Sequence, residues 1–294
     1  MVDGGSVRET GPPMRTGTLS ASDHDRDSAG LTYVYAVLSR RAGGVSVGIN
    51  LNPNHACNWR CVYCQVPELK RGGPPPIDLT LLKRELEGLL DEVVAGDFLA
   101  TRAPAGQRRL VDVAFSGNGE PTSAPEFPAA VALAEAALRR RGLLPDVALR
   151  LITNGSRLDR EPVREGLRRL GRAGGEAWFK VDAVGPEAMA ATNGVGLRPE
   201  TVERRLLACA SLCRTWVQTC LFGLDGRAPP EAALAALLGF YGRVAGPIAG
   251  VHLYGLARPS LQPGAARLSR LEAPWLEAFG ERVRGLGVAV QVSP

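Results

Sequence analysis

The sequence lacks any run of about eighteen apolar residues, the length needed for a helix that crosses a bilayer. Residues 1–30 also lack the apolar block of a signal peptide. We therefore expect no membrane partner and a cytoplasmic location, where thiols stay reduced and clustered cysteines favour metal binding over disulfides. No internal repeat and no clear linker divides the 294 residues, which indicates a single folded domain.

A strong excess of one charge is also missing. The net charge is +5, and 45% of the residues are hydrophobic and 22% charged, as in ordinary globular proteins. The small cationic excess suits an anionic small substrate, an acidic electron-transfer partner or nucleic acid. Because no basic stripe is interleaved with aromatic side chains, nucleic acid is the less favoured partner.

Residues 1–30 have almost no large apolar side chains and are rich in Gly, Ser, Thr, Pro and Asp. Such a segment cannot bury enough apolar surface to offset its ordering entropy, so we predict a disordered tail. The folded domain is then 31–294, with short extensions at either end of its main body.

Within that domain, buried-strand patterns alternate with amphipathic helix patterns. A short apolar run at 33–38 is expected to cover an open edge. The predicted strands are 45–51, 110–115, 147–152, 177–181, 216–222, 248–253 and 288–292, and the predicted helices are 79–94, 128–141, 162–170, 199–212, 230–244 and 274–284. Six strand–helix units imply a parallel sheet with right-handed crossovers. Six units rather than eight predict an α/β fold of the partial (β/α)6 TIM-like barrel type, open along one side.

The loop after the first of these strands carries three cysteines, Cys57, Cys61 and Cys64, in a C-x3-C-x2-C pattern with Tyr63 before the last. Three thiolates this close can converge on one metal centre. A closed zinc site takes four ligands and an electron-transfer cluster takes four cysteines. A four-iron cluster held by three cysteines would keep one iron free for another ligand. The alternatives are a zinc knuckle completed by His55, or three buried thiols.

Further polar residues follow the later strands, at the barrel end where chemistry is usually placed. The segment 116–122 reads Ser-Gly-Asn-Gly-Glu-Pro-Thr, and Thr153-Asn154-Gly155 ends the third strand. Lys180 and Asp182 are two apart and share a strand face, where they form either a site or a structural ion pair. Gln218 lies on the fifth strand and Arg258 follows the sixth.

The cysteine spacing with Tyr63 resembles that of the radical SAM superfamily. The resemblance covers about residues 33–258 and implies a radical SAM barrel. It also implies a 4Fe-4S cluster held by Cys57, Cys61 and Cys64, with S-adenosyl-L-methionine (SAM) bound at the free iron. Gly117-Asn118-Gly119-Glu120 is similar to the family's Gly-Gly-Glu segment, which binds the methionyl amine, with Asn118 intervening.

The same resemblance implies roles for the other polar residues. The implied cofactor-binding residues are Tyr63, Gly117, Asn118, Gly119, Glu120, Asn154, Asp182 and Gln218, with Asp182 at the SAM ribose. The implied catalytic residues are Lys180, Asp182 and Arg258, with Lys180 meeting the SAM carboxylate or the substrate and Arg258 gripping an anionic substrate or capping its loop.

Segments around the cysteine loop and Val217-Gln218-Thr219 resemble the branch that contains wyosine-forming tRNA enzymes and their uncharacterised relatives. The wyosine enzymes carry further cysteines before the barrel, whereas none precedes Cys57 here. The implied function is therefore reductive cleavage of SAM to a 5′-deoxyadenosyl radical that abstracts hydrogen from a small-molecule substrate. The resemblance leaves open whether a different carbon–sulfur bond of the SAM sulfonium is cleaved instead. An external one-electron reductant, such as flavodoxin or ferredoxin, is implied.

Two alternatives are a wyosine-type tRNA-modifying enzyme and, in a different class, a zinc-binding nucleic-acid module that uses the three cysteines and His55. The remaining cysteines are Cys209, Cys213 and Cys220. Cys209 and Cys213 are one helical turn apart, so a second cluster is conceivable. Small buried hydrophobic side chains are the favoured interpretation, because no dense cysteine loop gathers there.

Overall fold

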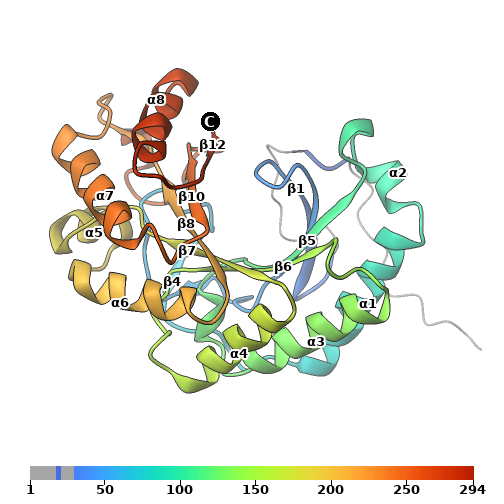
Figure 1. Ribbon diagram of the computed structural model, residues 1–294. Helices are drawn as coiled ribbons and strands as arrows, with labels where there is room; N and C mark the ends of the chain where they lie inside the picture. The colour runs from blue at the N-terminus through green and yellow to red at the C-terminus, as the bar shows by residue number, and fades with distance from the viewer. Residues whose placement is uncertain (1–17, 21–29) are drawn as a thin grey trace, which may run out of the picture.

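The computed structural model describes residues 18–20 and 30–294. One eight-stranded sheet, in the order β1-β2-β5-β6-β7-β8-β10-β12, curls into a half-barrel (Figure 1). Its strands are β1 (Val34–Ser39), β2 (Gly44–Ile49), β5 (Leu110–Phe115), β6 (Ala148–Thr153), β7 (Glu176–Lys180), β8 (Arg214–Cys220), β10 (Gly250–Tyr254) and β12 (Val290–Ser293). The edge strand β1 is antiparallel to β2, and the other neighbours are parallel.

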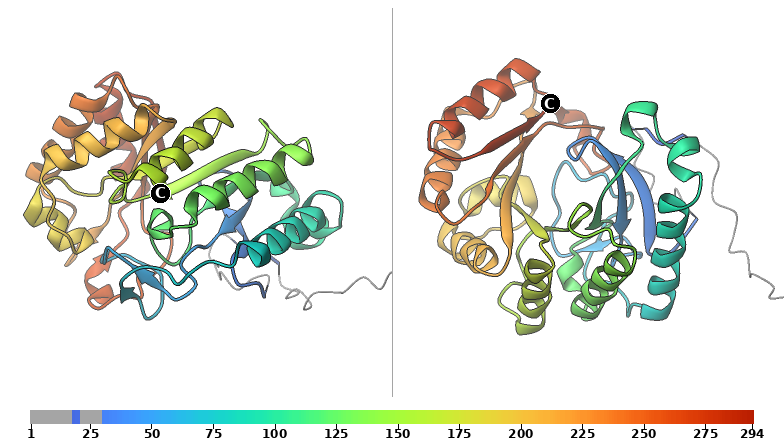
Figure 2. Two further views of the ribbon diagram at one scale, coloured as in Figure 1. Left: turned by 90° about the horizontal axis from the view of Figure 1, so that it is seen from below. Right: turned by 45° about the vertical axis from the view of Figure 1, so that its right-hand side comes forward.

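Helices cover the convex face of the sheet, as both views of Figure 2 show. They are α1 (Leu79–Val94), α2 (Phe98–Arg102), α3 (Phe127–Arg140), α4 (Glu161–Arg172), α5 (Pro186–Asn193), α6 (Pro199–Ala210), α7 (Glu231–Val244) and α8 (Ala273–Arg284). Asp78 caps α1, because its carboxylate accepts hydrogen bonds from the backbone N–H groups of Thr80 and Leu81. Proline in the first turn starts α3, α4, α5, α6 and α8.

The predicted partial barrel is confirmed, with six strand–helix units from β2 to α8. Two features differ from the prediction. Residues 34–39 do more than cover an edge, because they pair with β2 and extend the sheet. The short helix α5 was not predicted, because its eight residues are too few to show a clear amphipathic period.

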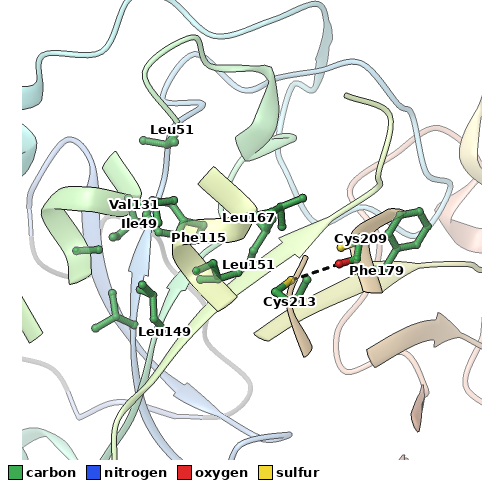
Figure 3. Packing of buried hydrophobic residues seen from close by; sticks show 14 of the residues in the cluster. Ile49, Leu51, Phe115, Val131, Leu149, Leu151, Leu167, Phe179, Cys209 and Cys213 are labelled. Carbon is green, nitrogen blue, oxygen red and sulfur yellow. Dashed lines mark hydrogen bonds between the residues drawn. The ribbon is translucent and has the colours of Figure 1, made fainter. Parts of the chain in front are cut away.

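Alternation along the strands divides apolar from polar side chains. Ile49, Phe115 and Leu151 project outward and pack against Val131 of α3 and Leu167 of α4 (Figure 3). The intervening positions of these strands and of β7, β8 and β10 face the inside of the half-barrel, and many of these are polar: Ser46, Asp112, Arg150, Lys180, Gln218 and His252. The inside of the sheet is therefore a chamber lined by these polar side chains together with apolar ones such as Ile152 and Trp178.

Most of the predicted disordered tail, 1–30, lies outside the described residues. Of the described part, Leu19 is buried, and its N–H donates to the carbonyl of Arg102 at 2.8 Å. Across residues 18–20 and 30–294, no helix has the length and apolarity to cross a membrane.

Candidate active site

The cysteine loop leaves the carboxyl end of β2 and is closed at its base by a short ladder. Strand β3 (Ala56–Cys57) pairs with β4 (Lys70–Arg71), so the start and end of the loop are tied together. Cys57, Cys61 and Cys64 all line one cavity of about 300 Å³ inside the half-barrel. The three predicted metal ligands are therefore brought together at the carboxyl ends of the strands.

Two of the sulfur atoms have N–H groups directed at them. The backbone N–H of Trp59 lies 3.4 Å from Cys57 Sγ, and the side-chain amide of Asn193 lies 3.3 Å from Cys61 Sγ. Burial raises the pKa of the Cys57 thiol to about 12 and that of Cys61 to about 11. Such donors stabilise negative charge on sulfur, as a bound thiolate requires.

The other end of the loop is held by residues 258–262. The carbonyl oxygen of Cys64 accepts hydrogen bonds from Leu261 N–H (3.0 Å), Ser260 Oγ (3.2 Å) and Gln262 Nε2 (3.3 Å). Gln262 Nε2 also donates to the Val66 carbonyl at 2.8 Å. This segment, which follows β10, fixes the backbone of the third cysteine.

The turn after β5 packs onto the base of the cysteine loop. Gly117 has a φ of +137°, which favours glycine, and an added Cβ would collide with Asn50. A Cβ on Gly119 would collide with the carbonyl of Ala56. The backbone N–H of Asn118 donates to Asn50 Oδ1 at 3.0 Å. Glycine is therefore required at both positions because the turn after β5 lies in close contact with residues 50 and 56. This contact fixes the turn relative to the cysteine loop.

Glu120 is buried, and both of its carboxylate oxygens accept hydrogen bonds. Oε1 accepts from the hydroxyls of Thr122 and Thr153, each at 2.6 Å, and Oε2 accepts from Asn154 N–H at 2.7 Å. Burial raises the pKa of this carboxyl, against the opposing effect of these donors. Glu120 thus joins the turns after β5 and β6 while it also lines the cavity.

Asn154 also contacts the cysteine loop. Its side-chain amide donates to Asn58 Oδ1 at 2.9 Å, and Asn58 Nδ2 donates to Ser156 Oγ at 2.6 Å. The turn after β6 therefore supports the residue that follows Cys57.

Lys180 and Asp182 form an ion pair, one of the two arrangements that the sequence predicts for them, with 3.4 Å between Nζ and Oδ2. The hydroxyl of Tyr63 donates to Asp182 Oδ2 at 2.5 Å, and Asn193 Nδ2 donates to the same oxygen at 2.8 Å. The backbone N–H of Cys220 donates to Oδ1 at 2.9 Å. The Asp182 side chain has an exposed fraction of 0%, so in this structure it makes internal contacts and ties the cysteine loop to α5.

Eight of the residues implied by the resemblance line the cavity together with the three cysteines: Tyr63, Gly117, Asn118, Gly119, Glu120, Asn154, Lys180 and Arg258. Asp182 and Gln218 do not. Gln218 is buried and accepts a hydrogen bond from Arg41 Nη1 at 2.8 Å, so it supports another side chain of the chamber. A SAM contact for Asp182 or Gln218 stays a prediction.

Two residues with clear roles in this geometry were missed from the sequence. Asn193 ends the short helix α5, and Arg41 belongs to the turn between β1 and β2. Neither lies in a recognisable motif. The pair Asn193-Gly194 was a usable signal for a helix end, because Gly194 adopts the left-handed conformation.

Three cysteines that line one cavity are a donor set that fits a four-iron cluster. Within the described residues, no three His, Cys, Asp or Glu side chains are grouped as a single metal ion requires. His55, the proposed fourth zinc ligand, has its Nδ1 3.0 Å from the Pro67 carbonyl. In a four-iron cubane each cysteine binds a different iron, so three cysteines spread around one cavity suit it.

Fold and site together define an α/β half-barrel protein with a three-cysteine centre at the carboxyl ends of its strands. The family model of the Radical SAM superfamily matches residues 51–227, more than half of the chain. The protein therefore belongs to the radical SAM superfamily and is an enzyme of that class. This membership sets aside the alternative of a zinc-binding nucleic-acid module.

Solved structures share the fold. A radical SAM methyltransferase from Sphaerobacter thermophilus is 18% identical with a TM-score of 0.53, over 88% of this chain and 68% of that one. Native anSMEcpe with bound AdoMet (SAM) and the Kp18Cys peptide is 15% identical with a TM-score of 0.51, over 83% of this chain and 63% of that one. Comparison with curated proteins gives no match.

Proposed function

We propose that the protein holds a 4Fe-4S cluster through Cys57, Cys61 and Cys64 and binds SAM beside it to modify a small-molecule substrate. When bound, the cluster and SAM supply one-electron cleavage of a carbon–sulfur bond and a 5′-deoxyadenosyl radical that abstracts a substrate hydrogen. The observation that carries this proposal is that the three cysteines share one cavity with Glu120 and Asn154.

The residues of this chain position the groups and exclude water. Trp59, in the cysteine loop, is buried and lines the cavity beside the cysteines. Glu120 offers a buried carboxylate for the SAM ammonium group, already oriented by its bonds to Thr153 and Asn154. A site that is rigid before binding loses less entropy when the cofactor binds.

Lys180 lies at the cavity wall, where its ammonium packs over the Tyr63 ring at 4.9 Å. We assign it to the SAM carboxylate or to the substrate, and Arg258 to an anionic group of the substrate. The electron comes from an external one-electron donor such as flavodoxin or ferredoxin. A wyosine-type tRNA activity is the less favoured candidate, because the sequence has no basic stripe interleaved with aromatic side chains.

Cysteine substitution tests the assignment. Cys57→Ala, Cys61→Ala and Cys64→Ala, each after anaerobic reconstitution, are expected to lose most of the bound iron and the broad sulfur-to-iron absorption. The matched control is Cys213→Ala, because Cys213 lies buried beside Cys209 and outside the cavity (Figure 3). Iron bound by all three variants at the level of the control would contradict the proposal.

A further inference from the structure

The cavity extends well below the cysteine loop. Its lining includes Ser46, Asp112, Arg150, Trp178 and Arg41, which lie toward the amino ends of the strands. The residues assigned to the cluster and SAM all lie at the carboxyl ends. The lower part of the cavity is therefore space for the substrate, if the proposed function holds.

Most of the charge in this lower part is already paired. Arg150 forms an ion pair with Asp112 and another with Glu176, the latter at 2.7 Å. Asp112 also accepts a hydrogen bond from Ser46. Lys180, above them, is paired with Asp182. In this set two cations face three carboxylates, and each of the two cations has a carboxylate within ion-pair distance.

Arg41 is different. Among the described residues it has no carboxylate within ion-pair distance, and its Nη1 donates to the neutral Gln218 Oε1 at 2.8 Å. Burial lowers the pKa of its guanidinium. Asp112 attracts this cation at longer range, but no carboxylate of the described residues contacts it, so an anion at this position would add a direct charge-assisted hydrogen bond.

The guanidinium of Arg41 is also held in place. Its Cζ packs over the ring of Trp178 at 4.7 Å and over the ring of Tyr254 at 4.8 Å. Gln218, which accepts from it, is itself fixed by a hydrogen bond from its Nε2 to the Trp178 carbonyl at 3.2 Å. Little side-chain freedom is left to lose on binding, and a planar guanidinium offers paired N–H groups that match carboxylate or phosphate oxygens.

We infer that Arg41 is the anchor for the substrate, and that the substrate is a small molecule carrying a carboxylate or phosphate group bound at the lower end of the cavity. This inference rests on the proposed function for the identity of the upper site. To that function it adds a substrate class, and it adds Arg41, in the turn between β1 and β2, as a residue that determines specificity. Its chemistry is a charge-assisted hydrogen bond, with no covalent step.

The test is anaerobic calorimetric titration of the reconstituted protein, with SAM present, using succinate and inorganic phosphate as probes and succinamide as the uncharged match. We expect one of the two anions to bind and succinamide not to bind. Arg41→Gln should weaken that binding about tenfold to a hundredfold, with Arg41→Lys between it and the unsubstituted protein. Succinate binding identifies a carboxylate substrate, and phosphate binding a phosphorylated one.

The matched control is Arg109→Gln. Arg109 is exposed and lines a second cavity, of about 500 Å³ at the amino ends of the strands, but not the cavity of the cysteines. Its substitution should leave anion affinity unchanged. The inference is overturned if neither anion binds, if Arg41→Gln and Arg41→Lys bind as well as the unsubstituted protein, or if Arg109→Gln loses as much affinity as Arg41→Gln. Iron content and SAM binding of the same preparation report separately on the proposed function.

Discussion

The side-chain amide of Asn193 lies 3.3 Å from Cys61 Sγ and 2.8 Å from Asp182 Oδ2, so one nitrogen contacts both a cysteine of the loop and the buried carboxylate. Asn193 is itself fully buried at the end of α5. The same helix contributes two carbonyl oxygens, of Thr192 and Asn193, that accept from the N–H groups of Val62 and Arg60. Helix α5 is therefore a support for the cysteine loop.

Asn193→Leu should lower the midpoint potential of the bound cluster. An N–H group directed at a ligand sulfur stabilises the extra negative charge of the reduced state, and leucine removes it at similar volume. The measurement is an anaerobic redox titration followed by electron paramagnetic resonance. Ala190→Ser, at an exposed position of the same helix, is the control. An unchanged potential at full iron content would show that this contact does not tune the cluster.

Glu120→Gln should weaken SAM binding about tenfold to a hundredfold, because it removes the charge that accepts the ammonium group. Thr122→Val separates this role from support of the turn, since it deletes one hydrogen bond to Glu120 but keeps the charge. Its effect on SAM affinity should be smaller. Equilibrium binding of SAM to cluster-loaded protein gives both values. Full affinity in Glu120→Gln would remove this residue from the SAM site.

Gln262→Leu should speed the loss of iron to a chelator and lower the free energy of unfolding by about 1–3 kcal/mol, because it removes the donor to the buried Val66 carbonyl and one of the three donors to the Cys64 carbonyl. The control is Leu261→Ala. The Leu261 side chain is 57% exposed, and its contribution to Cys64 comes from the backbone N–H, which alanine keeps. Equal rates of iron loss in the two variants would mean that residues 258–262 do not stabilise the loop.

Much of the barrel could be predicted because its signals are local. Helix α1 and strand β5 have the predicted bounds, since a capping aspartate starts one and a short apolar run with arginines before it defines the other. The cysteine spacing and the Gly-Asn-Gly-Glu turn are equally local. These motifs predict a group of polar residues at the carboxyl ends of the strands, and eight of the residues so predicted line the cavity with the three cysteines.

The contacts that could not be predicted from the sequence are those between segments far apart in the chain. Arg41 meets Gln218 across 177 positions of the chain, and Gln262 meets Val66 across 196. The contacts of Asp182 also depend on segments that are distant in the sequence. Its position just after β7 predicts either a ligand contact or an ion pair with Lys180, and in the structure Tyr63, Asn193 and Lys180 surround it.

The central claim is that this cavity supports radical cleavage of SAM. The most direct measurement adds dithionite and SAM to the anaerobically reconstituted protein and identifies the nucleoside and amino-acid products. The account predicts 5′-deoxyadenosine and methionine in equal amounts, and neither product from Cys61→Ala. A protein that binds one zinc ion through its cysteines and leaves SAM intact would contradict it.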